Sequence, residues 1–148
     1  MKSGSVAAPP LPSPSQDEQD AINTARESRS KRRPVVRFGL QQQGKNRVAA
    51  ASSHIDWDGW RDRLYNAFGT RSGDFLEAEL QRVLTMFRAK DGKIDTAAVE
   101  AVLAILDGSE PQNEIEAMLL IQMATTHALA MKLSRRLATV DTIEQNDS

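Results

Sequence analysis

The sequence contains no cysteine and only two histidines, His54 and His127. Disulfides and thiolate zinc sites are therefore excluded, and a histidine-based metal cluster would need carboxylates or a second chain. No Gly-rich phosphate loop, nucleophile elbow or other catalytic signature is present. We therefore expect a protein that is not an enzyme and that binds neither a cofactor nor a metal.

Long hydrophobic runs are also missing. The N-terminal "MKSGSVAAPPLPSPS" has no apolar core of the kind that a secretory signal requires. The most apolar stretch is interrupted by polar residues between Gln122 and His127, which would lie in the middle of a bilayer. The sequence therefore predicts a cytoplasmic protein that does not cross a membrane.

Charge is abundant but unevenly distributed along the 148 residues. Residues 1–50 carry nine Lys/Arg and four Asp/Glu, whereas residues 51–148 carry ten and sixteen. The first third is also rich in proline and serine and poor in core-forming residues, a composition typical of disorder. We expect a disordered, basic arm over residues 1–53, a helical domain over residues 54–138 and a polar tail over residues 139–148.

The basic residues of the arm lie between Arg26 and Arg47, where Glu27 is the single acid. Such a cluster attracts phosphates by Coulomb forces and counterion release, without any need for a defined fold. It is equally typical of a tail that only keeps a protein soluble, and Phe38 is the single aromatic residue available for base stacking. The candidates for nucleic-acid contact are Arg26, Arg29, Lys31, Arg32, Arg33, Arg37, Lys45 and Arg47.

Helical periodicity begins near residue 54 and predicts a small all-α bundle of about four helices. Apolar residues recur at spacings of three and four, with capping residues before each run and glycines after several of them. The expected N-caps are Asp56, Ser72 or Asp74, Asp95 or Thr96, and Asn113, and the expected stops include Gly69 and Gly108. The predicted helices span residues 56–68, 73–89, 95–107 and 113–138.

The turn "DGKID" before the third helix resembles the centre of an EF-hand loop. With Gly92 at loop position six, the first, third and twelfth positions fall on Phe87, Ala89 and Ala98, which carry no side-chain oxygen. The sequence therefore predicts a plain turn at Asp91 and Gly92.

The last helix, "NEIEAMLLIQMATTHALAMKLSRRL", is the longest and is apolar around most of its circumference. A helix of that kind is buried on more than one side, and the three shorter helices can cover only one. We therefore expect self-association, most simply as a dimer, because the other side also has to be covered. The interface candidates are Leu120, Ile121, Met123, Ala124, His127, Ala128 and Met131.

This helix and the following "IEQNDS" resemble part of a group of short, uncharacterised proteobacterial proteins. The matching residues are Glu116 to Leu119, Gln122 and Met123, Thr126 and His127, and Arg135 to Leu137. The resemblance implies a bacterial cytoplasmic setting and no catalytic activity.

Two functional hypotheses remain. The first is a non-enzymatic accessory protein, in which the helical body self-associates and the basic arm contacts nucleic acid without sequence preference. The alternative is a protein–protein adaptor, in which the long C-terminal helix docks an unknown protein partner and the arm is only solubilising.

Overall fold

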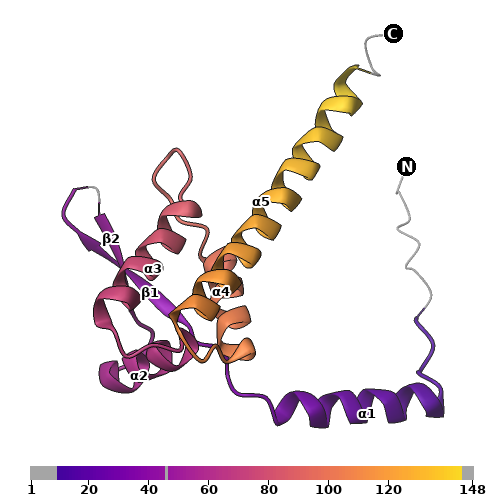
Figure 1. Cartoon of the computed structure of the whole chain (residues 1–148). Helices are drawn as coiled ribbons and strands as arrows, with labels where there is room; N and C mark the ends of the chain where they lie inside the picture. Colours follow the sequence, from indigo (N-terminus) through magenta and orange to yellow (C-terminus); the bar gives the residue numbers. More distant parts are fainter. Residues whose placement is uncertain (1–9, 46, 145–148) are drawn as a thin grey trace, which may run out of the picture. The chain divides into compact units, whose positions relative to one another are not determined.

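The computed structural model describes residues 10–45 and 47–144, and it divides into two compact units. The first unit ends at Pro34 and contains one helix, α1 (Gln16–Ser30). The second unit begins at Val35 and is mostly helical, with one pair of strands (Figure 1). Its elements are β1 (Phe38–Gln43), β2 (Arg47–Ser52), α2 (Trp57–Ala67), α3 (Gly73–Met86), α4 (Thr96–Ser109) and α5 (Glu114–Glu144).

Helix α1 lies within the segment that the sequence assigned to a disordered arm. Local contacts explain it: the Ser15 hydroxyl accepts a hydrogen bond from the Glu18 amide at 3.3 Å, and acidic residues occupy the first turn. The Lys31 ammonium lies 2.8 Å from the Glu27 carboxylate across one turn. No residue of α1 is buried, so the helix contributes nothing to a core. Residues 1–9 of the predicted arm lie outside the described residues.

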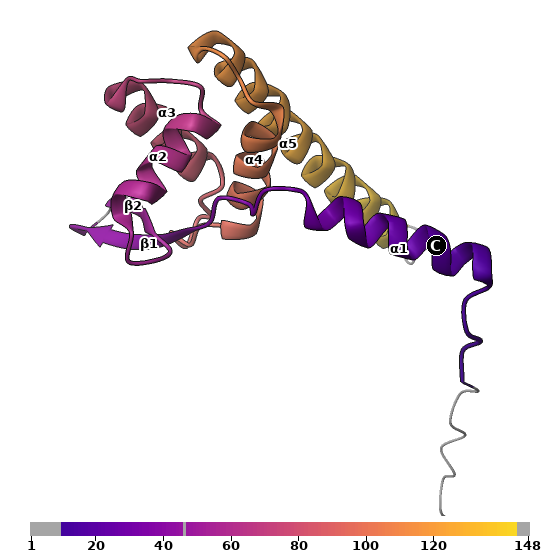
Figure 2. The same ribbon diagram turned by 90° about the horizontal axis from the view of Figure 1, so that it is seen from below.

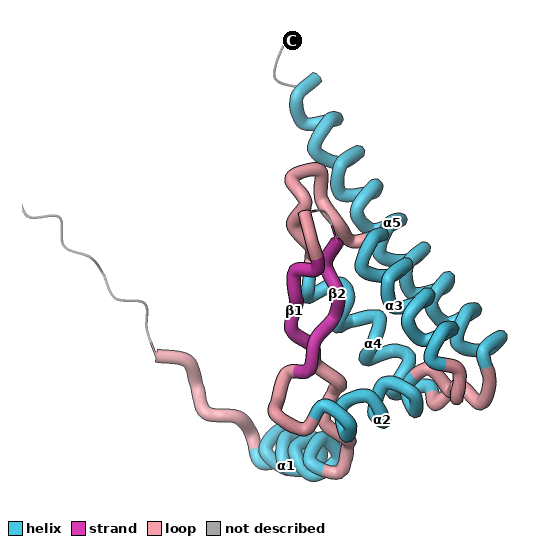
Figure 3. Tube along the Cα trace, turned by 90° about the vertical axis from the view of Figure 1, so that its left-hand side faces the viewer, coloured by secondary structure: helices cyan, strands magenta, loops and turns pink. Residues whose placement is uncertain are grey.

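The hairpin formed by β1 and β2 departs from the all-α prediction and corrects the disorder predicted up to residue 53. The strands pair antiparallel, from Phe38 opposite Ser52 to Gln43 opposite Arg47. Figure 3 shows the two strands side by side. Val36, Phe38 and Ala49 belong to the buried core. The hairpin forms because the apolar residues Val36 and Phe38 alternate along the chain, and the arginines and glutamines around them hide this pattern in the sequence.

The four helices predicted for the second unit are confirmed. Most of their ends lie within a few residues of the predicted positions. Each begins at one of the expected caps: Asp56, Ser72, Asp95 and Asn113 accept hydrogen bonds from backbone amides at 2.8 to 3.1 Å. The stop expected at Gly108 is wrong, since α4 includes this residue. Glu110, with a φ of 50°, takes the left-handed conformation that follows the helix.

One core joins the helices of the second unit. Helix α4 lies centrally and contacts α2, α3 and α5, and Figure 2 shows α4 beside α5. The apolar positions of α4, Val99, Val102, Leu103 and Leu106, are all at most 2% exposed. The other helices supply Trp60, Leu64, Leu76, Leu80, Val83, Leu84, Ala117, Ile121 and Ala124, and Phe68 follows directly after α2.

Helix α5 is much longer than the helices that it packs against. It has 31 residues, whereas α3 and α4 have 14 each. Thr125 is its last buried residue, and the following part extends beyond α3 and α4 (Figure 1). The helix continues to Glu144, so the polar tail predicted from residue 139 begins as helix, and residues 145–148 lie outside the described part. The part of α5 after Thr125 therefore projects beyond the buried core of the second unit.

Candidate functional site

All eight basic candidates for nucleic-acid contact are exposed. The structure describes them as two groups, one in each unit. Arg26 and Arg29 lie on α1, and Lys31, Arg32 and Arg33 follow it directly. The second group consists of Arg37, Lys45 and Arg47, which lie before, between and at the start of the two strands.

The first group combines high charge density with a helix end. Five cationic side chains fall within eight consecutive positions, from Arg26 to Arg33, and the last turn of α1 carries Arg29. Cations at the C-terminal end of a helix are favoured by its dipole, which supports the helical conformation. The pair of Lys31 with Glu27 is 72% and 69% exposed at its side chains, so water screens it and leaves the lysine charge accessible.

The second group lies on a segment that is anchored to the core. The Trp60 indole N–H donates a hydrogen bond to the Arg37 backbone oxygen at 2.8 Å, which fixes the chain just before β1. At the start of β2, an Arg47 guanidinium nitrogen lies 3.6 Å from a Glu77 carboxylate oxygen, with both side chains largely exposed. The hairpin therefore holds three cations on the surface of the body, one of them beside an acid.

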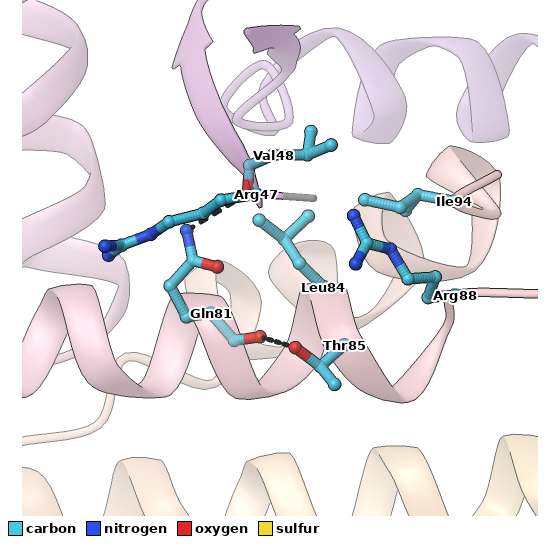
Figure 4. Close-up of a pocket in the computed structure, with 7 residues that line it drawn as sticks. All are labelled: Arg47, Val48, Gln81, Leu84, Thr85, Arg88 and Ile94. Carbon is cyan, nitrogen blue, oxygen red and sulfur yellow. Dashed lines mark hydrogen bonds between the residues drawn. The ribbon is translucent and has the colours of Figure 1, made fainter. Parts of the chain in front are cut away.

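A small cavity of about 130 Å³ lies between β2, the end of α3 and the loop that follows it. Figure 4 shows Leu84 and Ile94 facing each other across it, while the Arg47 side chain points away. The Gln81 side chain donates a hydrogen bond to the Val48 backbone oxygen at 3.2 Å and thereby ties β2 to α3. This bond gives Gln81 a structural role in docking the hairpin.

The residues expected at an oligomer interface fall on different sides of α5. Ile121 and Ala124 are 5% and 6% exposed and belong to the core of the chain itself. Leu120 and Ala128 are half-buried. The remaining three, Met123, His127 and Met131, are exposed. The assignment of Ile121 and Ala124 to an intermolecular interface is therefore corrected, because the body already covers them.

A different row of large apolar residues is free on α5. Ile115, Leu119, Leu129, Leu133 and Leu137 are between 39% and 69% exposed, and we call them the outer face of α5. They recur at spacings of four or in steps compatible with 3.6 residues per turn, so they share one side of the helix. The buried Ala117, Ile121 and Ala124 lie on the opposite side. Two alanines, Ala117 and Ala124, thus face the body, and several large apolar residues of α5 face away.

A groove of about 490 Å³ lies beneath the projecting half of α5. Its walls come from the end of α3, the start of α4 and the body-facing side of α5. The residues that line it include the apolar Phe87, Ala98 and Met131 and the charged Asp95, Lys132 and Arg135. The groove is therefore open and amphipathic, and Leu129 of the outer face is also among the residues that line it.

The charged groups of the described residues include no cluster of three or more His, Cys, Asp or Glu that could hold a metal ion. Both histidines, His54 and His127, are exposed, so His127 does not pack in the core as a helix-packing histidine would. Near the start of α5, the Thr70 hydroxyl donates a hydrogen bond to a Glu114 oxygen at 2.7 Å and lowers the pKa of that carboxyl. This contact joins the turn after α2 to the first turn of α5.

Within residues 10–45 and 47–144, no helix has the length and apolar composition that a membrane span requires. Comparisons of the chain with protein-family models, curated proteins and solved structures found no match. The resemblance to a group of proteobacterial proteins therefore stays a prediction.

The outer face was missed from the sequence for an identifiable reason. Helix α5 is apolar around most of its circumference, so its sequence does not separate a buried side from an exposed one by hydrophobicity alone. The alanines at positions 117 and 124 mark the side on which another helix can approach closely, while the leucines at 119 and 133 mark the other. This size difference was the available signal.

Proposed function

We propose that this chain is a non-enzymatic accessory protein that contacts nucleic acid through its basic segment and self-associates through α5. The observation that carries the proposal is the exposure of all eight cations between Arg26 and Arg47, five of them within or directly after a helix that has no buried residue. These exposed cationic side chains are accessible to phosphates. Binding by the basic segment is expected to be insensitive to base sequence, because phosphates carry no sequence information.

Self-association is supported by the apolar outer face of α5. Exposed leucines occur singly on most surfaces, but here three of them, Leu129, Leu133 and Leu137, follow one another along the projecting half of one helix. Bringing two such helices together would remove apolar surface from water. A dimer would also present two basic segments, which raises the effective concentration of the second segment once the first is bound.

The nucleic-acid part is tested by fluorescence anisotropy with labelled duplex DNA and single-stranded RNA at low and moderate salt. The test variant is the full chain with Arg26, Arg29 and Arg32 changed to Gln. Its matched control changes Arg61, Arg71 and Lys90 to Gln, which removes the same charge from exposed positions of the second unit. Each lost phosphate contact is expected to lower the log–log salt slope for duplex DNA by about 0.9, so the test variant should lose up to about 3 in slope.

The control variant is expected to keep most of the wild-type affinity. Equal losses in the two variants would mean that net charge alone governs binding, and this would contradict a defined basic segment. Absence of wild-type binding at low salt would refute the nucleic-acid part altogether.

Self-association is tested by light scattering on the wild type and on two matched variants. Leu133→Glu places a charge on the outer face, whereas Met131→Glu places one on the body-facing side, at residues that are 58% and 59% exposed. The proposal expects a dimeric wild type, a monomeric Leu133→Glu variant and a dimeric Met131→Glu variant. A monomeric wild type at micromolar concentration would contradict it.

The second candidate function is a protein–protein adaptor, and the groove beneath α5 favours it. Its apolar floor and its cationic edge at Lys132 and Arg135 suit an apolar segment that carries acidic residues. In that case Met131→Glu would weaken partner binding, while Leu133→Glu would leave it unchanged. The same two variants therefore separate the adaptor from the self-associating protein.

A further inference from the structure

We infer that the outer face of α5 pairs with the same face of a second copy in the antiparallel orientation, about a two-fold axis that crosses the seam at the level of residue 124. This inference rests on the proposed self-association and adds the partner's orientation and register. It predicts which residues of the two copies meet.

The spacing along α5 supports a helix pair. Ile115, Leu119, Gln122, Thr126, Leu129 and Leu133 follow one another in alternating steps of four and three residues, the spacing of a two-helix seam. At 100° per residue these six positions fall within a sector of about 80°. All six are exposed.

The body does not obstruct this seam. The buried positions Ala117, Ile121 and Ala124 lie on the opposite side of the helix, where α5 contacts α3 and α4, and the buried Thr125 borders the seam on one flank. A second helix can therefore approach along the outer face without displacing any core residue.

The composition of the seam suits a symmetric antiparallel register. With the axis at the level of residue 124, Ile115 lies opposite Leu133 of the second copy, and Leu119 lies opposite Leu129 of the second copy. The two polar positions, Gln122 and Thr126, then lie opposite each other at the centre, where the side-chain amide can meet the hydroxyl. Apolar layers thus enclose one polar layer, an arrangement that can fix the register of a helix pair.

Charge selects the antiparallel orientation over the parallel one. The first turn of α5 carries Glu114 and Glu116, and the projecting half carries Lys132, Arg135 and Arg136. Antiparallel pairing brings the acidic end of each helix beside the basic region of the other, and Glu114 lies on the same flank of the seam as Arg136 of the second copy. Parallel pairing would bring like charges together and would align the two helix dipoles.

The absence of cysteine makes a direct test available, because one introduced cysteine can form a disulfide only with another chain. Ile115→Cys and Leu133→Cys each change an exposed residue, so the fold is expected to persist in both full-length variants. In the inferred register, two copies of the same cysteine are 18 residues apart along the pair, or about 27 Å at 1.5 Å per residue. This separation exceeds the roughly 7 Å between Cα atoms that a disulfide allows.

The two variants are oxidised with copper phenanthroline, separately and as an equilibrated mixture, and are analysed by mass spectrometry and non-reducing electrophoresis. The inference expects no cross-link in either sample alone and a shift to the mass of a mixed disulfide dimer in the mixture. Cross-linking of each variant with itself would show parallel pairing and would overturn the inference.

Light scattering on the uncross-linked samples separates the remaining outcomes. Dimers that give no mixed disulfide would overturn the register while the proposed self-association stands. A monomeric wild type would overturn both. Burial of the outer face against a helix of another protein or against a lipid surface would then be the remaining explanation of its apolar residues.

Discussion

Replacement of Gly69 by alanine is expected to destabilise the body strongly, because this glycine lies where two connections meet. Gly69 follows α2 with a φ of +56°, a conformation that costs residues with a Cβ about 1–2 kcal/mol. A Cβ at this position would lie 2.7 Å from the carbonyl carbon of Pro111 and closer still to its oxygen. It would also lie 3.3 Å from the amide nitrogen of Asn113, the cap of α5.

The magnitude follows from adding these two effects. Displacement of a packed backbone segment by an added methyl group typically costs about 1–3 kcal/mol, so the total for Gly69→Ala is about 2–5 kcal/mol. Gly92 provides the control for conformation alone, because its φ is +85° and its Cβ would meet nothing within 4 Å. Gly92→Ala should therefore cost only about 1–2 kcal/mol. Gly108 lies within α4 with open space around it, and Gly108→Ala should gain up to about 1 kcal/mol.

The assay is thermal unfolding followed by circular dichroism, at one fixed protein concentration, because self-association makes Tm depend on concentration. At roughly 4 °C per kcal/mol, Gly69→Ala should lower Tm by about 8–20 °C. A Tm for Gly69→Ala equal to that for Gly92→Ala would refute the reasoning. It would mean that the connection at Pro111 adjusts freely and does not fix the start of α5.

Two further expectations concern named contacts. The Thr70 hydroxyl holds the pKa of Glu114 below its ordinary value of 4.5. The ionised form therefore contributes stability above about pH 4.5, and this contribution is lost as pH falls through the lowered pKa. Urea unfolding should therefore show Glu114→Gln to be less stable than the wild type at pH 7, with the difference disappearing in acid. Trp60→Phe removes the donor to the Arg37 oxygen and should cost about 1–3 kcal/mol and speed amide exchange in β1. Trp57→Phe, at a residue that is 49% exposed, should leave that exchange unchanged.

The central helices could be located from the sequence because their local signals agree with their packing. In α4, the cap at Asp95 and the apolar row from Val99 to Leu106 indicate the same helix and the same buried side. The end of α4 could not be located as well. Gly108 is a common stop signal, but the helix continues past it, and the left-handed residue is Glu110.

The hairpin could not be predicted because its stabilisation is mainly long-range. Phe38 is buried by residues from the helical region, and Trp60, 23 positions after Arg37, supplies the hydrogen bond that anchors it. Composition around these residues is polar and basic, so a local window resembles a disordered arm. Helix α1 shows the converse case, in which capping and neighbouring side-chain pairs form a helix with no core contact at all.

The distribution of residue sizes on α5 supports the proposed self-association. Ala117 and Ala124 face the body, and their small side chains allow α5 to lie close to its neighbours. Leucines at 119, 129 and 133 would each contribute about 1.5–3 kcal/mol if fully buried, yet within the second unit they remain in contact with water. In a single chain, an exposed leucine and a polar helix former contribute about equally to stability, because their helix propensities are similar. If the apolar row is buried against a second helix, as proposed, the stability of the body should rise with protein concentration.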